Sequence, residues 1–93
     1  GYYKENEYGI RIENLIAVKD DTRDTDEQTM YAFETLTLAP IDPRCIDFNL
    51  LNKPEREWLA EYHCDVYDTL ESRMEGAARD WLDTLCKSYQ ATQ

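Results

Sequence analysis

The chain has 93 residues, with 20 Asp or Glu against 10 Lys or Arg, so its formal net charge is −10. Because the sequence has no basic cluster, it lacks the positive stripe that nucleic-acid backbones and anionic membranes require, and both partners are disfavoured. No apolar run approaches the roughly 18 residues of a membrane span, and the sequence has neither a signal-peptide pattern nor an initiating Met. We therefore expect one small folded unit, excised from a longer protein.

The first predicted element is a β-strand over residues 9–19, preceded by a turn or short hairpin around Glu5 and Asn6. Large apolar residues alternate with polar ones along it, which is typical of a half-buried strand. The residues expected on one face are Ile10, Ile12, Asn14, Ile16 and Val18. Arg11 and Glu13 share the other face, where the pair requires a salt bridge, a ligand or a metal. A structural ion pair is the default interpretation.

An acidic loop and a second strand follow. Residues 20–28 contain five acidic residues and one basic residue, which predicts a solvated loop. Oxygen donors alternate there as in a calcium-binding loop, but the central Gly and the closing Glu of such a loop are out of register. Residues 33–39 are rich in β-branched and aromatic side chains and predict an antiparallel strand that ends at Pro40 and Pro43.

Two helices are predicted after an irregular segment whose expected core anchors are Ile46, Phe48, Leu50 and Leu51. Asn52 and Glu55 form a capping-box pattern, with Pro54 in the first turn, so the first helix begins here and runs to about Met74. Gly76 marks the break before a second helix. The expected apolar stripes are Trp58, Leu59, Tyr62, Val66, Leu70 and Met74 on the first helix and Ala78, Trp81, Leu82, Leu85 and Tyr89 on the second. The fold class is α+β: a small antiparallel β-sheet followed by two C-terminal α-helices.

The remaining reactive side chains carry little evidence of a site. His63 is the one histidine, and its place beside the apolar stripe favours a packing role over that of a ligand or base. Cys45, Cys64 and Cys86 are odd in number and lie 19 and 22 residues apart, which matches no zinc pattern and argues against a disulfide framework. We expect reduced, intracellular thiols. Cys64 has no basic neighbour to lower its pKa, so a reactive thiolate is not expected.

Residues 1–3 followed by residues 8–14 resemble the last catalytic segment of the Xaa-Pro aminopeptidases (aminopeptidase P), which have the pita-bread metallopeptidase fold. Later segments are similar to the same family in the same order: residues 33–41 to its next strand, 46–63 to the start of its C-terminal helical region, and 78–82 to its final helix. The resemblance covers nearly the whole chain and is greatest to the long, three-domain form typical of eukaryotic cytosol.

The resemblance implies a division of the chain and roles for two residues. Residues 1–43 would be the end of the catalytic domain and residues 44–93 a C-terminal helical extension, packed as one compact unit. The family holds two divalent metal ions, usually manganese, with two Asp, one His and two Glu. Glu13 corresponds to the Glu that bridges both ions, and Arg11 lies behind it and helps to organise the site and the substrate. The other four ligands lie before Gly1 in the family.

The resemblance also implies a metal-dependent hydrolase that cleaves the N-terminal peptide bond preceding proline. Its substrates are peptides with proline at the second position. Its other partners are the rest of the catalytic domain and a second subunit in a homodimer, and its location is the cytoplasm. One ligand of five cannot hold two metal ions, so we expect the isolated chain to be inactive and to bind no metal. The alternative is a non-catalytic structural or dimerisation module. In either case, a strand cut from its sheet would promote self-association.

Overall fold

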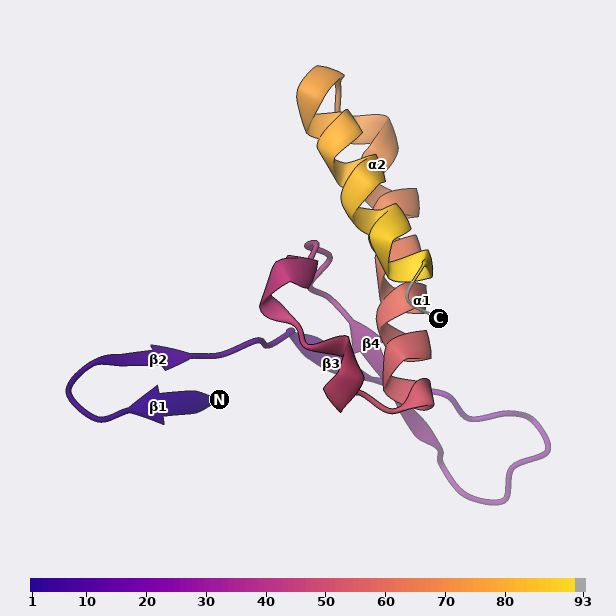
Figure 1. Ribbon diagram of the computed structural model, residues 1–93. Helices are drawn as coiled ribbons and strands as arrows, with labels where there is room; N and C mark the ends of the chain where they lie inside the picture. Colours follow the sequence, from indigo (N-terminus) through magenta and orange to yellow (C-terminus); the bar gives the residue numbers. More distant parts are fainter. Residues whose placement is uncertain (92–93) are drawn as a thin grey trace. The chain divides into compact units, whose positions relative to one another are not determined.

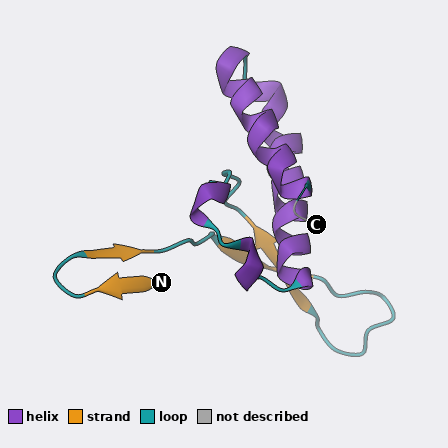
Figure 2. Ribbon diagram, in the orientation of Figure 1, coloured by secondary structure: helices purple, strands orange, loops and turns teal. Residues whose placement is uncertain are grey.

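The structure is a computed structural model, and it describes residues 1–91 (Figures 1 and 2). Two antiparallel sheets of two strands each precede two C-terminal helices, which confirms the α+β class, although the one predicted sheet is two separate hairpins. The chain forms two compact units, Gly1–Thr37 and Leu38–Gln93. This division falls a few residues before the boundary predicted after residue 43, and the assignment of residues 1–43 to a catalytic domain stays a prediction.

The first hairpin pairs β1 (Tyr2–Lys4) with β2 (Tyr8–Ile10). The Glu7 amide donates to the Lys4 carbonyl over 3.0 Å and closes the turn. Asn6 has a φ of 61°, a left-handed conformation that asparagine tolerates better than most residues. The hairpin predicted around Glu5 and Asn6 is therefore confirmed.

The second hairpin pairs β3 (Ile16–Asp20) with β4 (Tyr31–Thr35) through the acidic loop. The continuous strand predicted over residues 9–19 is wrong, because β2 pairs with β1 and β3 pairs with β4, and residues 11–15 lie between the two ladders. The second predicted strand is displaced as well. The amides of residues 36 and 37 both donate to the Leu15 carbonyl, which ends the ladder before residue 39.

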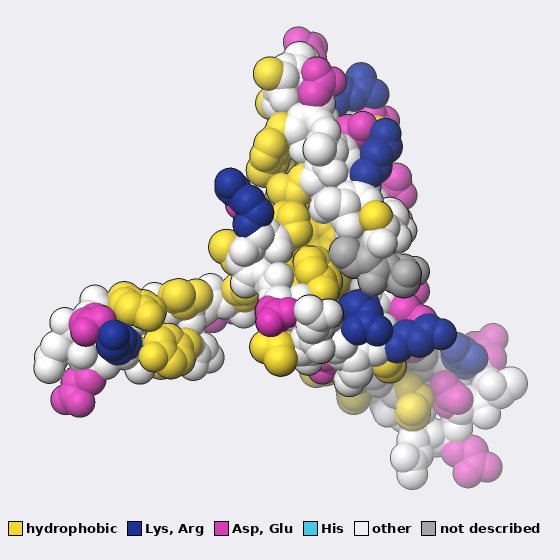
Figure 3. Space-filling view, in the orientation of Figure 1, with side chains coloured by type: hydrophobic (Ala, Val, Ile, Leu, Met, Phe, Trp, Pro, Cys, Tyr) yellow, Lys and Arg dark blue, Asp and Glu magenta, His cyan; other side chains and the backbone are white. Residues whose placement is uncertain are grey.

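The hairpin unit has no core of its own. None of residues 1–37 is buried, and the predicted apolar face is exposed to solvent. The exposed large hydrophobic residues of this unit are Tyr2, Tyr3, Tyr8, Ile10, Ile12, Leu15, Ile16, Val18, Met30, Tyr31, Phe33 and Leu36. Figure 3 shows hydrophobic side chains over the β1–β2 hairpin. Twelve exposed side chains in 37 residues form far more apolar surface than scattered single residues would.

The helical unit is built on α1 (Lys53–Leu70) and α2 (Gly76–Gln90), joined by a 3-10 turn at Glu71–Arg73. The predicted capping box is confirmed: the Glu55 amide donates to the Asn52 side chain, and the Asn52 amide donates to the Glu55 carboxylate, each over 2.9 Å. Gly76 has a φ of +59°, which a residue with a side chain rarely adopts. The second helix begins at this glycine, after the predicted break, whereas α1 ends at Leu70 and not at about Met74, because a 3-10 turn over Glu71–Arg73 takes over from it.

The core of the molecule lies between the two helices. It consists of Tyr62, Val66, Leu82, Leu85, Cys86 and Tyr89, with Ile46, Phe48, Leu59, Leu70 and Met74 packed against it. Two short 3-10 turns, Pro43–Cys45 and Phe48–Leu50, precede α1. Four predicted core residues are exposed: Trp58, whose ring stacks on that of Tyr62, Ala78, Trp81, and Leu50, which is 82% exposed.

Replacing Asn52 by Ala should destabilise the helical unit by about 0.5–2 kcal/mol, because the amide of residue 55 would lose its capping acceptor. Urea unfolding followed by far-UV circular dichroism measures the change. Asn49→Ala is the matched control, since it removes an exposed amide side chain that caps no α-helix. Equal stability of the two variants would show that the capping box contributes nothing.

Candidate functional site

Arg11 and Glu13 lie in the connection between β2 and β3, and not within a strand. Arg11 Nη2 donates to Glu13 Oε1 over 2.7 Å, and the two side chains are 56% and 67% exposed. The sequence left a salt bridge, a ligand or a metal open as the partner of this pair, and the structure shows the salt bridge. Such an exposed pair contributes little to stability.

Tyr3 is a further member of this group, which sequence reasoning left without a role. Hydrogen bonding to the Tyr3 side chain, followed by hydrogen bonding to Glu13, raises the pKa of Arg11. Tyr3 lies opposite Gly9 across the first hairpin. A Cβ atom on Gly9 would lie 2.7 Å from the Tyr3 ring, so a larger residue at this position would require the ring to move. The glycine of the Gly9-Ile10-Arg11 stretch thus gives Tyr3 room to lie beside Arg11.

The described part of the chain does not by itself complete a metal centre. Among residues 1–91, no three His, Cys, Asp or Glu side chains come together in a way that could hold a metal ion. In the acidic loop, Asp20 accepts a hydrogen bond from the Thr22 amide and Asp26 one from the Arg23 amide, each over 2.8 Å. These carboxylates stabilise the loop itself. Glu13 could serve a dinuclear metal centre only with donors from elsewhere.

His63 is a packing residue, as predicted. Its side chain is 0% exposed, and both ring nitrogens contact the backbone: Nδ1 lies 2.7 Å from the Leu59 carbonyl and Nε2 lies 3.0 Å from the Ile41 amide. Burial lowers the pKa of His63, against a smaller rise caused by the Leu59 carbonyl. Neither nitrogen is available to a ligand or substrate.

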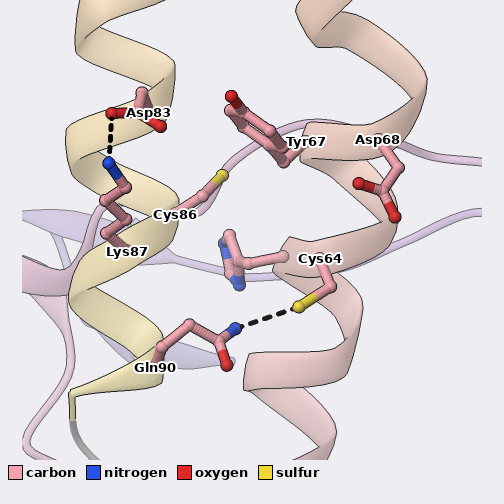
Figure 4. Close-up of a pocket in the computed structure, with 8 residues that line it drawn as sticks. Cys64, Tyr67, Asp68, Asp83, Cys86, Lys87 and Gln90 are labelled. Atoms are coloured by element: carbon pink, nitrogen blue, oxygen red, sulfur yellow. Dashed lines mark hydrogen bonds and ion pairs between the residues drawn. The ribbon is translucent and has the colours of Figure 1, made fainter.

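A groove of about 370 Å³ lies between α1 and α2 (Figure 4). Two of its cationic or amide side chains already have partners within the protein. Lys87 Nζ donates to Asp83 over 2.8 Å, and Gln90 Nε2 donates to the Ala60 carbonyl over 3.0 Å and to Cys64 Sγ over 3.1 Å. The groove therefore offers a ligand few unused hydrogen-bonding groups, and we do not assign it a catalytic role.

The three cysteines are free thiols, as predicted. Cys45 and Cys64 are exposed, whereas Cys86 is buried beside the groove. Burial is the main cause that raises the pKa of Cys86, so this thiol stays protonated at neutral pH. In the described part of the chain, none of the helices is both long and apolar enough to span a membrane.

Comparison with known proteins identifies the family. Residues 29–89 match the family described as the C-terminal region of peptidase M24. "Probable Xaa-Pro aminopeptidase P" of Laccaria bicolor is 33% identical over 90 residues, which are 92% of this chain and 14% of that protein. "Aminopeptidase P2" of Arabidopsis thaliana is 38% identical over 87 residues, 88% of this chain and 12% of that protein.

A third relative has a different name. "Protein pid-5" of Caenorhabditis elegans is 39% identical over 93 residues, which are 94% of this chain and 9% of that protein. The chain thus spans only 9–14% of the length of these three relatives. No solved structure matches it. The resemblance to the C-terminal portion of Xaa-Pro aminopeptidases is confirmed, and the chain belongs to the family of peptidase M24 C-terminal regions.

Proposed function

We propose that the chain is the C-terminal portion of a metal-dependent Xaa-Pro aminopeptidase, a cytoplasmic hydrolase that removes the first residue of peptides with proline at the second position. One observation carries the proposal. Two relatives, each named "Probable Xaa-Pro aminopeptidase P", match 92% and 88% of this chain at 33% and 35% identity. The longer protein, and not the 93-residue chain, performs the reaction.

Glu13 is the one metal ligand that this chain supplies in the proposal. A flexible exposed glutamate would be a poor ligand, because its side chain would have to be ordered before it could bind. The 2.7 Å bond from Arg11 restrains the Glu13 carboxylate, and Tyr3 in turn restrains Arg11. Carboxylate oxygens suit hard divalent ions such as manganese. The remaining ligands come from the part of the catalytic domain outside this chain.

The exposed apolar surface of residues 1–37 supports a further part of the proposal, namely that this unit packs against the rest of the catalytic domain. A two-stranded hairpin without a buried face is marginally stable in water, and neither hairpin contains a buried residue. The hairpins therefore belong against another surface, which we take to be the rest of the catalytic domain. If that domain is absent from the natural protein, the same surface favours a structural or dimerisation module, and a homodimer is expected in either case.

The encoded sequence before Gly1 and one assay separate the two functions. An enzyme requires a Glu-Pro pair, two Asp and a His ligand upstream. The longer protein, supplied with manganese, should release arginine from Arg-Pro-Pro, and a peptide with alanine at the second position serves as the control. Upstream ligands with no such cleavage, or equal cleavage of both peptides, would contradict the proposed activity.

The isolated 93-residue chain should neither cleave Arg-Pro-Pro nor bind manganese measurably, because Glu13 has no companion ligands among the described residues. Product release measured by chromatography and manganese titration by calorimetry test this prediction. Turnover by the purified chain, or manganese binding that the Glu13→Gln variant lacks, would show that it holds more of the site than we propose.

A further inference from the structure

The short segment Ala39–Ile41 follows the boundary between the two units and is held by side chains of both helices. Tyr62, on α1, donates its hydroxyl proton to the Ala39 carbonyl over 3.0 Å, and the same oxygen lies 3.2 Å from the Ala39 amide. Tyr89, on α2, donates to the Ile41 carbonyl. Side chains thus replace the neighbouring strand that an extended backbone segment would otherwise use to satisfy its hydrogen bonds.

His63 supplies the remaining bond, and its partners determine its protonation state. The Leu59 carbonyl can only accept a hydrogen bond, so the Nδ1 atom that lies 2.7 Å from it must carry a proton. The Ile41 amide can only donate, so the Nε2 atom that lies 3.0 Å from it must present a lone pair. Only the neutral Nδ1–H tautomer satisfies both bonds. A proton on Nε2 would directly oppose the Ile41 N–H.

The surroundings of His63 also disfavour the charged ring. The ring is buried and stacks on Tyr89, with ring centroids 3.6 Å apart, and Tyr62 contacts it edge-on at 5.1 Å. The titratable groups on the elements packed around it are Tyr62, Cys64, Tyr67 and Asp68 on α1, Asp83, Cys86, Lys87 and Tyr89 on α2, and Asp42 after the segment. Burial, with Asp42 next, raises the pKa of Tyr89 to about 12, so this neighbour is neutral. Asp83 is paired with Lys87.

We propose that His63 is a proton-controlled anchor: protonation of Nε2 releases the Ile41 amide and loosens residues 38–41, while α1 and α2 remain paired. The anchor acts at the short segment that leads from the hairpin unit into the helical unit. The bonds from Tyr62 to the Ala39 carbonyl and from Tyr89 to the Ile41 carbonyl do not involve the titrating nitrogen, so they remain when the Ile41 amide is released, and the segment loosens without leaving the helices.

The direction of the pH effect follows from the neutral state that the folded protein requires. Burial holds the pKa of His63 below its ordinary value of about 6.5. The anchor is therefore intact above about pH 6.5 and weakens as the pH falls. Between the unfolded and folded pKa values, the equilibrium constant for release rises about tenfold per pH unit.

Nuclear magnetic resonance of the 93-residue chain tests the anchor between about pH 8 and about pH 4.5. Nitrogen-15 shifts of the imidazole should show the Nδ1–H tautomer at the upper pH. The exchange protection of the Ile41 amide, corrected for intrinsic rates, should fall in step with the titration of His63. The Leu85 amide, inside α2, should keep its protection. An Nε2–H tautomer, a His63 pKa of about 6.5 or above, or equal losses at both amides would overturn the proposal.

His63→Gln is the matched variant, because its amide oxygen can accept from the Ile41 N–H but does not titrate. In this variant, Ile41 protection should be independent of pH over the same range. Loss of protection with the wild-type pH dependence would overturn the assignment to His63. If the variant does not fold, the tautomer and the wild-type titration decide the question alone.

Discussion

Replacing Glu13 by Gln in the longer protein is expected to lower kcat for Arg-Pro-Pro by more than 100-fold and to lower its manganese content. Removing a residue that only hydrogen-bonds to a metal ligand typically costs roughly 10–100-fold in activity or metal affinity. The fall in kcat here should exceed that range. If Glu13 holds metal as proposed, its carboxylate would supply two oxygen atoms and a negative charge, whereas glutamine offers one neutral oxygen and an amide nitrogen. Steady-state kinetics and metal analysis of the purified protein measure both effects.

Glu7→Gln is the control for this experiment. Glu7 is another exposed glutamate of the hairpin unit in an ion pair, with Lys4 Nζ 2.9 Å from its carboxylate, and it has no role in the proposed site. Its replacement should leave both kcat and metal content near their original values. If Glu13→Gln behaves like Glu7→Gln, the ion pair of Arg11 and Glu13 is only structural, and the proposed metal ligand is wrong.

Replacing Leu82 by Ala should destabilise the helical unit by about 2–5 kcal/mol, the range for truncating a buried leucine. Leu82 is 0% exposed and belongs to the core cluster. A small domain has a total stability of about 5–15 kcal/mol, so this one change would remove a large part of it. The midpoint and slope of urea unfolding, followed by helical circular dichroism, give the free energy of unfolding.

Leu50→Ala provides the comparison for the same chemical change on the surface. Leu50 is 82% exposed, and its truncation should alter the free energy of unfolding by less than about 0.5 kcal/mol. Similar losses in the two variants would show that the helix pair is not the stabilising core of the chain.

Features that depend on neighbours in sequence could be predicted. Asn52, Pro54 and Glu55 specify the start of α1 because their hydrogen bonds join residues three positions apart. The turn at Asn6 and the break at Gly76 follow from the backbone conformations that these residues accept. The pairing of Arg11 with Glu13 is equally local, since two positions along the chain separate them.

Features that depend on distant partners could not be predicted. Alternation from Ile10 to Val18 indicates one long strand, but strands exist only where a second strand pairs with them, and the partners here lie on two different hairpins. In the same way, helical spacing places Leu82 and Trp81 on one stripe, while only the position of α1 decides that Leu82 is buried and Trp81 is exposed.

The sequence by itself determined the fold class, the helix boundaries near Asn52 and Gly76, the packing role of His63 and the family. Only the tertiary structure placed residues 11–15 between two hairpins, left the apolar side chains of the first unit exposed, and joined His63 and Tyr89 to Ile41. The physical reason is the range of the interactions. Caps and turns join residues a few positions apart, whereas Ile41 lies 22 residues from His63 and 48 from Tyr89, a separation that no local pattern encodes.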